Sequence, residues 1–186
     1  MSLYYTSIIA IRQIDLKKII AYSSISHMAL VIMGLYSFTI EGILGSFYLI
    51  LSHGFVSGGL FYIIGCLYDR YKTRIILYYG GLAQINPKLS FFRFLFILGN
   101  ISFPFTSNFL AELLILIGLI QVNFYLVIII SFSSLFILSY NLLFFTKIFF
   151  GLFINFNKNI IKNNIIIDLI TYKEIITCFI LLFPIF

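Results

Sequence analysis

The stretch ILGSFYLILSHGFVSGGLFYIIGCL, residues 43–67, decides the fold of this chain. It holds no Asp, Glu, Lys or Arg, and its one histidine is His53. As an α-helix it extends about 37 Å, whereas the hydrocarbon core of a bilayer is roughly 30 Å thick. An apolar run of this length predicts a helix that crosses a membrane.

The composition of the whole chain agrees with that prediction. Of its 186 residues, 62% are hydrophobic and 10% are charged, whereas soluble domains carry about 25% charged residues. This shortage of charge excludes a water-soluble surface. The net charge of +6 does not indicate a nucleic-acid partner, because the cations lie in loops and at the ends of apolar runs. Cys66 and Cys178 have neither metal-binding nor redox spacing, so we expect no metal site.

Further apolar runs on either side predict an all-α fold. We expect a polytopic bundle of transmembrane helices that forms one membrane domain over residues 1–186. The expected spans are a partial one at about 1–11, then 19–36, 43–67, 89–120 and 123–147, and a weak one at about 170–186.

The span at 89–120 is expected to be discontinuous, broken near Pro104 within the sequence NISFPFTSN at 100–108. Proline has no backbone N–H and interrupts helical hydrogen bonding. Unwound backbone at membrane depth is tolerated where it is buried in protein or lines a wet cavity, and transporters place ion sites at such breaks. A packed proline kink is the alternative interpretation.

The cations divide the predicted loops into two classes. The span count places all 12 Lys and Arg residues on one side of the membrane, in the loops 12–18, 69–88 and 150–165 and at the adjoining span ends. The opposite turns lie at 37–42 and 121–123. Because Lys and Arg accumulate on the inner side of membrane proteins, this pattern predicts the orientation of the chain.

Three ionisable residues are expected near mid-depth: His27, His53 and Glu112. Charging a group there is costly, so such residues are functional by default. Histidine exchanges protons near neutral pH, and hydration can switch the state of a carboxyl group. Helical spacing places Ser23 and Ser24 on the face of His27, where a hydroxyl or a water can reach the ring. The pattern predicts a proton relay; the alternative is neutral histidines that only hydrogen-bond to other helices.

Several stretches of this sequence resemble one known family. They are 11–30 (IRQIDLKKIIAYSSISHMAL), 50–74 (ILSHGFVSGGLFYIIGCLYDRYKTR), 102–118 (SFPFTSNFLAELLILIG) and 79–82 (YGGL). Their order and spacing closely resemble the C-terminal part of chain 4 of mitochondrial NADH:ubiquinone oxidoreductase (respiratory complex I), an antiporter-like subunit. The resemblance covers about residues 3–150.

The resemblance implies roles for individual residues. His27, His53 and Glu112 fall on the mid-membrane proton relay of that family. Lys17 falls in the family's Asp-(Leu/Ile)-Lys motif at the basic end of a helix, which implies a role at a proton entrance or in the structure.

The sequence also departs from the family. The helix that corresponds to 89–120 is discontinuous there, in agreement with Pro104, but Phe105 and Ala111 stand where glycine is frequent. The larger departure is the absence of the N-terminal half with its membrane lysines, since no lysine precedes Lys17. We therefore expect a split subunit, in which a separate polypeptide equivalent to the N-terminal half of chain 4 packs against residues 1–30.

The implied function is proton movement across the mitochondrial inner membrane, coupled to electron transfer from NADH to ubiquinone in other subunits. The chain itself is expected to bind no cofactor; the NADH, FMN, iron–sulfur clusters and ubiquinone implied by the resemblance belong to the rest of the complex. Its expected neighbours are other complex I membrane subunits and lipid, and its basic loops should face the matrix. The alternatives are a piece of a cation/proton antiporter and a structural segment of complex I that does not pump.

Overall fold

A computed structural model describes residues 2–81, 87–150 and 171–186, so the loop expected at 150–165 and part of the loop 69–88 lie outside the described residues. The described residues form helices without a strand, apart from one isolated bridge between Asp15 and Ile75. The elements are α1 (Ser2–Arg12), α2 (Leu16–Tyr36), α3 (Ile40–Tyr71), η1 (Ile76–Tyr79), α5 (Pro87–Asn100), α6 (Ser107–Val122), α7 (Phe124–Phe149) and α9 (Tyr172–Leu182). The expected all-α, polytopic fold with one discontinuous helix is confirmed.

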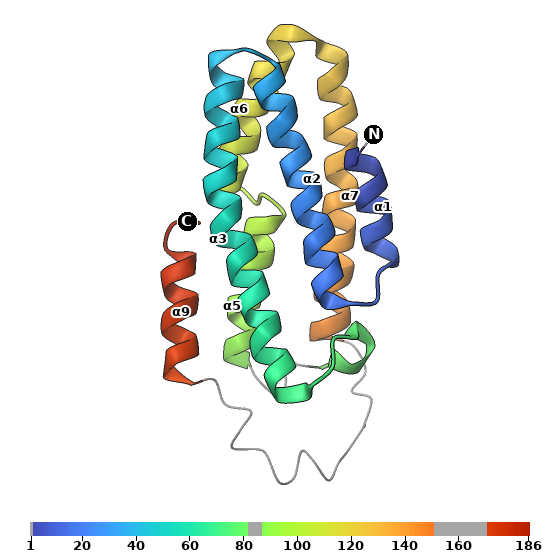
Figure 1. Ribbon diagram of the computed structural model, residues 1–186, viewed down its shortest axis with the longest axis vertical. Helices are drawn as coiled ribbons and strands as arrows, with labels where there is room; N and C mark the ends of the chain where they lie inside the picture. The colour runs from blue at the N-terminus through green and yellow to red at the C-terminus, as the bar shows by residue number, and fades with distance from the viewer. Residues whose placement is uncertain (1, 82–86, 151–170) are drawn as a thin grey trace.

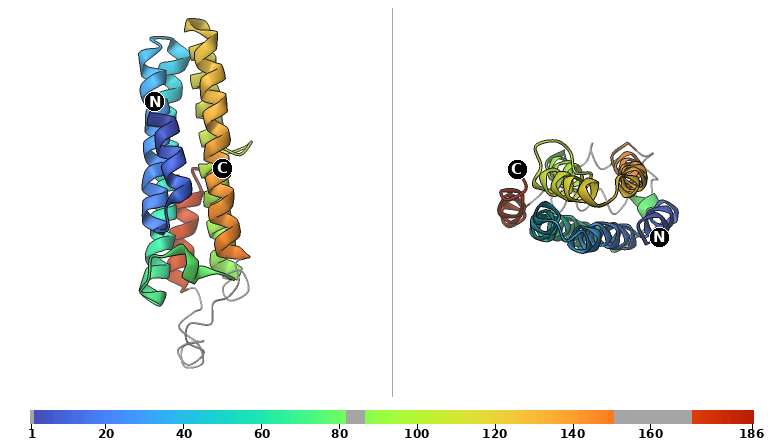
Figure 2. Two further views of the ribbon diagram at one scale, coloured as in Figure 1. Left: turned by 90° about the vertical axis from the view of Figure 1, so that its right-hand side faces the viewer. Right: turned by 90° about the horizontal axis from the view of Figure 1, so that it is seen from above.

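The helices form two layers, seen from above in Figure 2. One layer contains α1, α2 and α3, and the other contains α7 and the discontinuous helix, in which α5 and α6 stack end to end (Figure 1). Among the described helices, α2, α3 and α7 are long and apolar enough to cross a membrane by themselves. The 11-residue helices α1 and α9 extend only about 16 Å, roughly half of a bilayer core.

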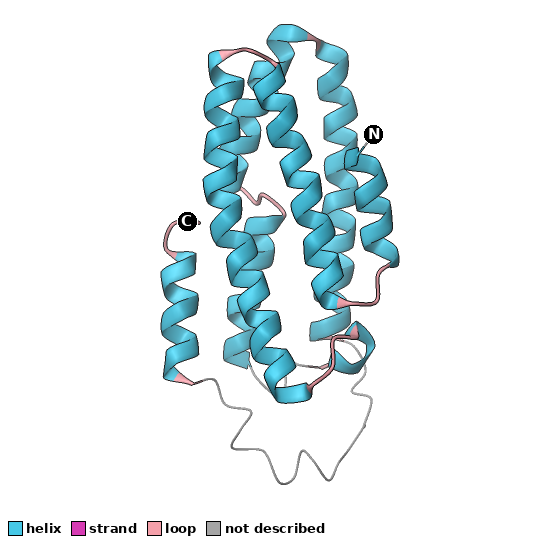
Figure 3. Cartoon of the chain, viewed as in Figure 1, coloured by secondary structure: helices cyan, strands magenta, loops and turns pink. Residues whose placement is uncertain are grey.

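Loops and turns lie at the ends of the helices, with one inside the bundle between α5 and α6 (Figure 3). At the start of α3, Thr39 accepts a hydrogen bond from the N–H of Gly42, and at the start of α7, Asn123 accepts one from the N–H of Tyr125. These caps satisfy N–H groups that have no partner inside their helix. Both lie at the upper end of the bundle in Figure 1, where the turns 37–42 and 121–123 were expected to share one side.

The cation-rich segments lie together at the other end (Figure 1). There the N–H of Leu16 donates a hydrogen bond to the carbonyl of Arg74, with 3.0 Å between nitrogen and oxygen. Arg70 and Glu174 form an ion pair with 2.6 Å between nitrogen and oxygen, which holds α9 against α3. Among the described loops, the cation-rich ones therefore lie at one end of the bundle and the turns without Lys or Arg at the other.

α3 and α6 pack closely at one level of the bundle, near Gly45 and Ala111. A Cβ atom at Gly45 would lie 2.8 Å from the Cβ of Leu114 and 3.0 Å from the carbonyl oxygen of Ala111, closer than side chains tolerate. Ala111 is completely buried in this contact. By contrast, a Cβ at Gly54 or Gly58, also on α3, would meet no atom of the described structure within 4 Å. The glycines of α3 thus form a tight contact at one level and an open face at another.

Arg93, which the sequence placed near the end of a span, is buried in the bundle. It lies on α5, is 2% exposed, and its guanidinium lies 5.9 Å from the centre of the Phe144 ring on α7, a cation–π contact. Burial raises the pKa of the neighbouring Tyr79 in η1, so this phenol stays neutral and is no counter-ion. Sequence position did not reveal the burial, because Arg93 lies only about two turns from the start of its helix.

Candidate functional site

His27 of α2 and Glu112 of α6 meet inside the bundle. Nδ1 of His27 lies 3.3 Å from Oε1 of Glu112, which is an ion-pair distance. The His27 side chain is completely buried, and that of Glu112 is 21% exposed. The sequence predicted that both lie near mid-depth, and the structure brings them into direct contact.

His53 of α3 lies against His27. The ring centres are 4.9 Å apart, and the ring planes are tilted by 35°. His53 is 4% exposed, and neither of its ring nitrogens has a hydrogen-bond partner among the described residues. Because the rings touch without a hydrogen bond, a proton can pass between the histidines only through a bridging group or after a ring moves.

The break between α5 and α6 supplies polar groups to this cluster. Ser102 donates a hydrogen bond to Oε1 of Glu112, with 2.6 Å between the oxygens. Nε2 of His27 lies 3.2 Å from the backbone oxygen of Asn100. Phe105 has a φ of 77°, in the left-handed region that favours glycine. Phe105 thus adopts a conformation that favours glycine, at the position where the sequence analysis noted a departure from glycine.

Buried asparagines hold the broken helix, and the sequence analysis did not identify them. Nδ2 of Asn108 donates to the carbonyl of Gly99 at 2.9 Å. Nδ2 of Asn100 donates to Oδ1 of Asn141 on α7 at 3.0 Å, and Asn141 donates in turn to the carbonyl of Ile137. All three amides are at most 3% exposed. Their presence in otherwise apolar runs was the signal that could have revealed them.

Ser23 and Ser24 form no hydrogen bond with the ring of His27 in the structure, so the hydroxyl contact expected there is not made directly. Ser23 donates its hydroxyl to the carbonyl of Ile20, and Ser24 donates to that of Ala21, both at 2.7 Å. Short hydroxyl side chains on a helix reach the carbonyls of their own preceding turn. In apolar surroundings this local bond satisfies the hydroxyl donor without a partner from another helix.

Tyr140 of α7 adds a hydroxyl group that sequence reasoning did not predict. It is 2% exposed, and its hydroxyl lies near Ser23, Ser26 and Asn141. None of these neighbours forms a hydrogen bond of ordinary geometry with it. The tyrosine thus extends the polar wall between α2 and α7 beside His27.

Glu112 also borders a cavity of about 110 Å³ between α2, α6 and α7. Its lining is mostly apolar, from Leu and Ile side chains, and its polar groups are Glu112 and the three serines Ser131, Ser133 and Ser134 of α7. A polar cavity can hold water once it offers about 10–15 Å³. The carboxyl group therefore faces His27 on one side and a space that water can enter on the other.

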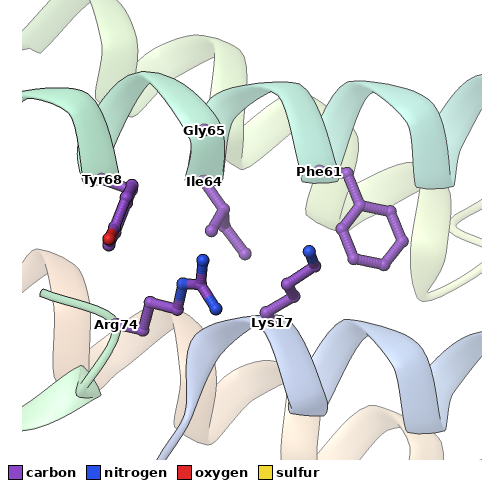
Figure 4. A pocket seen from close by; sticks show the side chains of 6 residues that line it. All are labelled: Lys17, Phe61, Ile64, Gly65, Tyr68 and Arg74. Carbon is purple, nitrogen blue, oxygen red and sulfur yellow. The ribbon is translucent and has the colours of Figure 1, made fainter.

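Lys17 lies apart from these contacts. It is exposed at the start of α2, about 15 Å along the helix from His27. In Figure 4, Lys17 and Arg74 extend toward a groove that is bordered by Phe61 and Tyr68 of α3. The Arg74 guanidinium lies 4.7 Å from the centre of the Tyr68 ring. Lys17 belongs to the cation-rich end of the bundle.

The chemistry available to the cluster is proton exchange. A buried imidazole beside a carboxyl group can share one proton in two ways, as neutral ring and acid or as imidazolium and carboxylate. The described residues contain no group of three His, Cys, Asp or Glu side chains placed to hold a metal. Buried ionisable residues beside a broken helix are characteristic of polytopic membrane proteins that move ions.

Comparison with known proteins identifies the family within that class. The family described as NADH:quinone oxidoreductase/Mrp antiporter, transmembrane, matches residues 1–137, and the chain belongs to it. NADH-ubiquinone oxidoreductase chain 4 of Acanthamoeba castellanii is 50% identical over 81% of this chain and 30% of the relative. Chain 4 of Dictyostelium citrinum is 42% identical over 95% of this chain and 45% of the relative. The resemblance to chain 4 is confirmed, and the chain spans less than half of these relatives.

Solved structures agree with this assignment. A chain of respiratory complex I from Thermus thermophilus with bound NADH superimposes with a TM-score of 0.77 at 30% identity, covering 90% of this chain and 36% of that one. A chain of the Mrp complex from Dietzia superimposes with a TM-score of 0.76 at 23% identity, covering 81% and 28%. The second likeness concerns the fold alone.

We expect the substitutions His27→Ala and Glu112→Gln to act non-additively on stability. The two side chains touch, so each substitution removes the same interaction. Thermal unfolding of the detergent-solubilised chain, measured for both single variants and the double variant, should give a coupling free energy of about 0.5–3 kcal/mol.

Glu41→Gln provides the matched control, because Glu41 lies in the first turn of α3, at the opposite end of the bundle from the cations. Its effect should add to that of His27→Ala within about 0.5 kcal/mol. Additive effects of the His27 and Glu112 substitutions would contradict their contact.

Proposed function

We propose that this chain is the C-terminal part of a proton-translocating subunit of NADH:ubiquinone oxidoreductase, with His27, His53 and Glu112 as its proton relay. The observation that carries the proposal is the contact of these residues beside a helix break, one residue from each of α2, α3 and α6. Ionisable groups at bilayer depth are costly, so a cluster of them supports a role in moving charge.

Each residue has a distinct part in the proposed relay. Glu112 exchanges protons with water in the neighbouring cavity and with Nδ1 of His27. His53, whose ring lies against that of His27, continues the relay into α3. Electron transfer from NADH to ubiquinone takes place in other subunits, which hold the FMN and iron–sulfur clusters, and this chain contributes proton movement alone.

A cation/proton antiporter is the second candidate, supported by the fold shared with the Mrp complex chain from Dietzia. The 42–50% identity to NADH-ubiquinone oxidoreductase chain 4 in two organisms favours the complex I role. A structural segment without pumping is the third candidate. The direct contact between His27 and Glu112 speaks against it, because a segment with no proton to move does not require an ionisable pair at this depth.

We predict that Glu112→Gln and His27→Ala impair proton pumping and slow coupled NADH oxidation, while the chain stays in the membrane and in its complex. The amide of Gln keeps the shape of Glu but cannot take up or release a proton. The measurement is the proton-to-electron ratio of the intact complex in sealed vesicles. Glu41→Gln, which removes the same charge far from the relay, should leave that ratio unchanged. A normal ratio in Glu112→Gln would refute the assigned role.

We further propose that the chain lies in the mitochondrial inner membrane with its cation-rich end in the matrix. The gathering of Arg12, Lys17, Lys18, Arg70 and Arg74 at one end of the bundle supports this orientation. Protease should then cleave within 69–88 in inverted inner-membrane vesicles and not in intact mitoplasts. Cleavage of this loop in mitoplasts would reverse the topology.

The same orientation gives Lys17 a place at the matrix surface, where a role at a proton entrance or in holding the loop structure is proposed. Its position beside Arg74 in an exposed groove supports either role (Figure 4).

We also propose that a separate polypeptide, equivalent to the N-terminal half of chain 4, packs against residues 1–30 and supplies membrane lysines to the relay, together with other membrane subunits of the complex. The exposed apolar side chains of Tyr5, Ile8 and Ile25 on α1 and α2 support a further surface packed against residues 1–30.

Cross-linking tests this partner. A photoreactive residue in place of the exposed Tyr5 or Ile25 should capture one polypeptide with mid-membrane lysines in the intact complex. A photoreactive residue at the exposed Phe179 of α9 serves as the control and should not capture it. Capture of lipid or an unrelated subunit at both Tyr5 and Ile25 would exclude the split subunit.

A further inference from the structure

The backbone carbonyl of Asn100 cannot have its ordinary helical partner. In a continuous α-helix it would accept a hydrogen bond from the N–H of residue 104. Residue 104 is proline, which has no N–H. The preceding carbonyl, that of Gly99, accepts hydrogen bonds from the N–H of Ser102 and from the side chain of Asn108. α5 ends at Asn100: Ser102 reverses the chain in the left-handed conformation, and the N–H of Phe103 bonds back to Leu98. Since Pro104 also prevents the helix from continuing, the buried carbonyl of Asn100 needs a donor from outside the helix.

His27 is that donor. Its Nε2 lies 3.2 Å from the oxygen of Asn100, and both residues are at most 2% exposed. A carbonyl oxygen can only accept, so the hydrogen of this contact has to sit on Nε2. At bilayer depth an unpaired carbonyl is costly, and the contact is favoured for that reason.

The hydrogen on Nε2 determines the state of the other ring nitrogen, Nδ1. When Nε2 of a neutral imidazole carries the hydrogen, Nδ1 carries the lone pair. Nδ1 lies 3.3 Å from Oε1 of Glu112, within ion-pair distance but without hydrogen-bond geometry in this arrangement, so a small rotation has to precede transfer. A proton held between these two atoms can reside on the oxygen, beside a neutral ring, or on the nitrogen, beside a carboxylate.

We infer that Pro104 is a positioning residue of the relay: by freeing the carbonyl of Asn100, it fixes the tautomer of His27 and directs Nδ1 at Glu112 as the atom that receives the proton. The mechanistic meaning of this inference rests on the proposed function, whereas the tautomer can be measured without it. The helix break then has a chemical role in addition to its effect on the shape of the helix.

The proton step follows from this arrangement. The O–H bond of protonated Glu112 breaks, and an N–H bond forms at Nδ1, which leaves a carboxylate and an imidazolium. The carboxylate keeps the hydrogen bond from Ser102, and the imidazolium keeps its bond from Nε2 to Asn100. Since the carbonyl of Asn100 cannot take up the proton of Nε2, onward transfer through Nε2 requires this bond to open first.

Nitrogen NMR tests the tautomer directly. The chain has two histidines, so ¹⁵N-histidine in the full chain, reconstituted in phosphatidylcholine vesicles, gives two sets of ring signals that a His53→Gln variant assigns. At a pH where the rings are neutral, His27 should carry its hydrogen on Nε2. In Pro104→Ala the new N–H competes for Asn100, and the ratio of Nε2–H to Nδ1–H should fall about fivefold, the change that one net hydrogen bond produces.

Pro87→Ala is the matched control, since Pro87 begins α5 at the other end of that helix, and it should leave the ratio unchanged. A second measurement needs no substitution at Pro104: a dipolar contact between ¹³C-labelled Asn100 carbonyl and Nε2 of His27 should be present in the native chain. Hydrogen on Nδ1 of native His27, an unchanged ratio in folded Pro104→Ala, or a missing dipolar contact would each overturn the inference.

The test separates this inference from the proposed function. Normal pumping by Glu112→Gln together with an Nε2-protonated His27 would reject the relay and support the tautomer assignment. Lost pumping by Glu112→Gln together with an Nδ1-protonated His27 would reject the role of Pro104 alone.

Discussion

The missing N–H of Pro104 is the constraint on which the site depends. Inside a bilayer every backbone carbonyl has to find a donor within the protein. At the break, side chains supply the missing donors: Asn108 donates to the carbonyl of Gly99, and His27 donates to that of Asn100. The same bonds that repair the helix therefore bring a titratable ring to the centre of the bundle. Structure and chemistry share these contacts, so a substitution in the break changes both.

The packing of α3 and α6 fixes the other half of the geometry. Gly45 allows the backbone of α6 to approach so closely that Ala111 has no freedom to shift along α3. Glu112 follows directly and is thereby held at the level of His27. Ser102, in the left-handed conformation at a φ of 59°, turns its hydroxyl toward the carboxyl group. A rigid contact between helices and a strained turn together place one carboxylate within reach of one ring nitrogen.

The sequence predicted the helices and the ionisable residues of the site, but it did not predict the uncharged polar residues that surround them. Apolar length and the absence of charge predict α2, α3 and α7, and proline predicts the break, because these depend on local composition. His27, His53 and Glu112 stand out since ionisable residues are rare in such runs. Asn141 and Tyr140 lie on α7, remote in sequence from the break, and only packing brings them to His27. Ser23 does not bond to His27 because a carbonyl of its own helix lies nearer. Arg93 is buried, although its position near a helix end suggested an exposed side chain.

The cluster is well connected on one side and open on the other. Glu112 has Ser102, His27 and a cavity lined by serines, whereas the ring of His53 touches only the face of His27 among the groups described for it. A buried imidazole with two unsatisfied nitrogens is unfavourable in an apolar bundle. In the proposed relay His53 therefore needs a further acceptor. Because its ring is 4% exposed, a movement of the ring or a water that enters the bundle has to connect it to one.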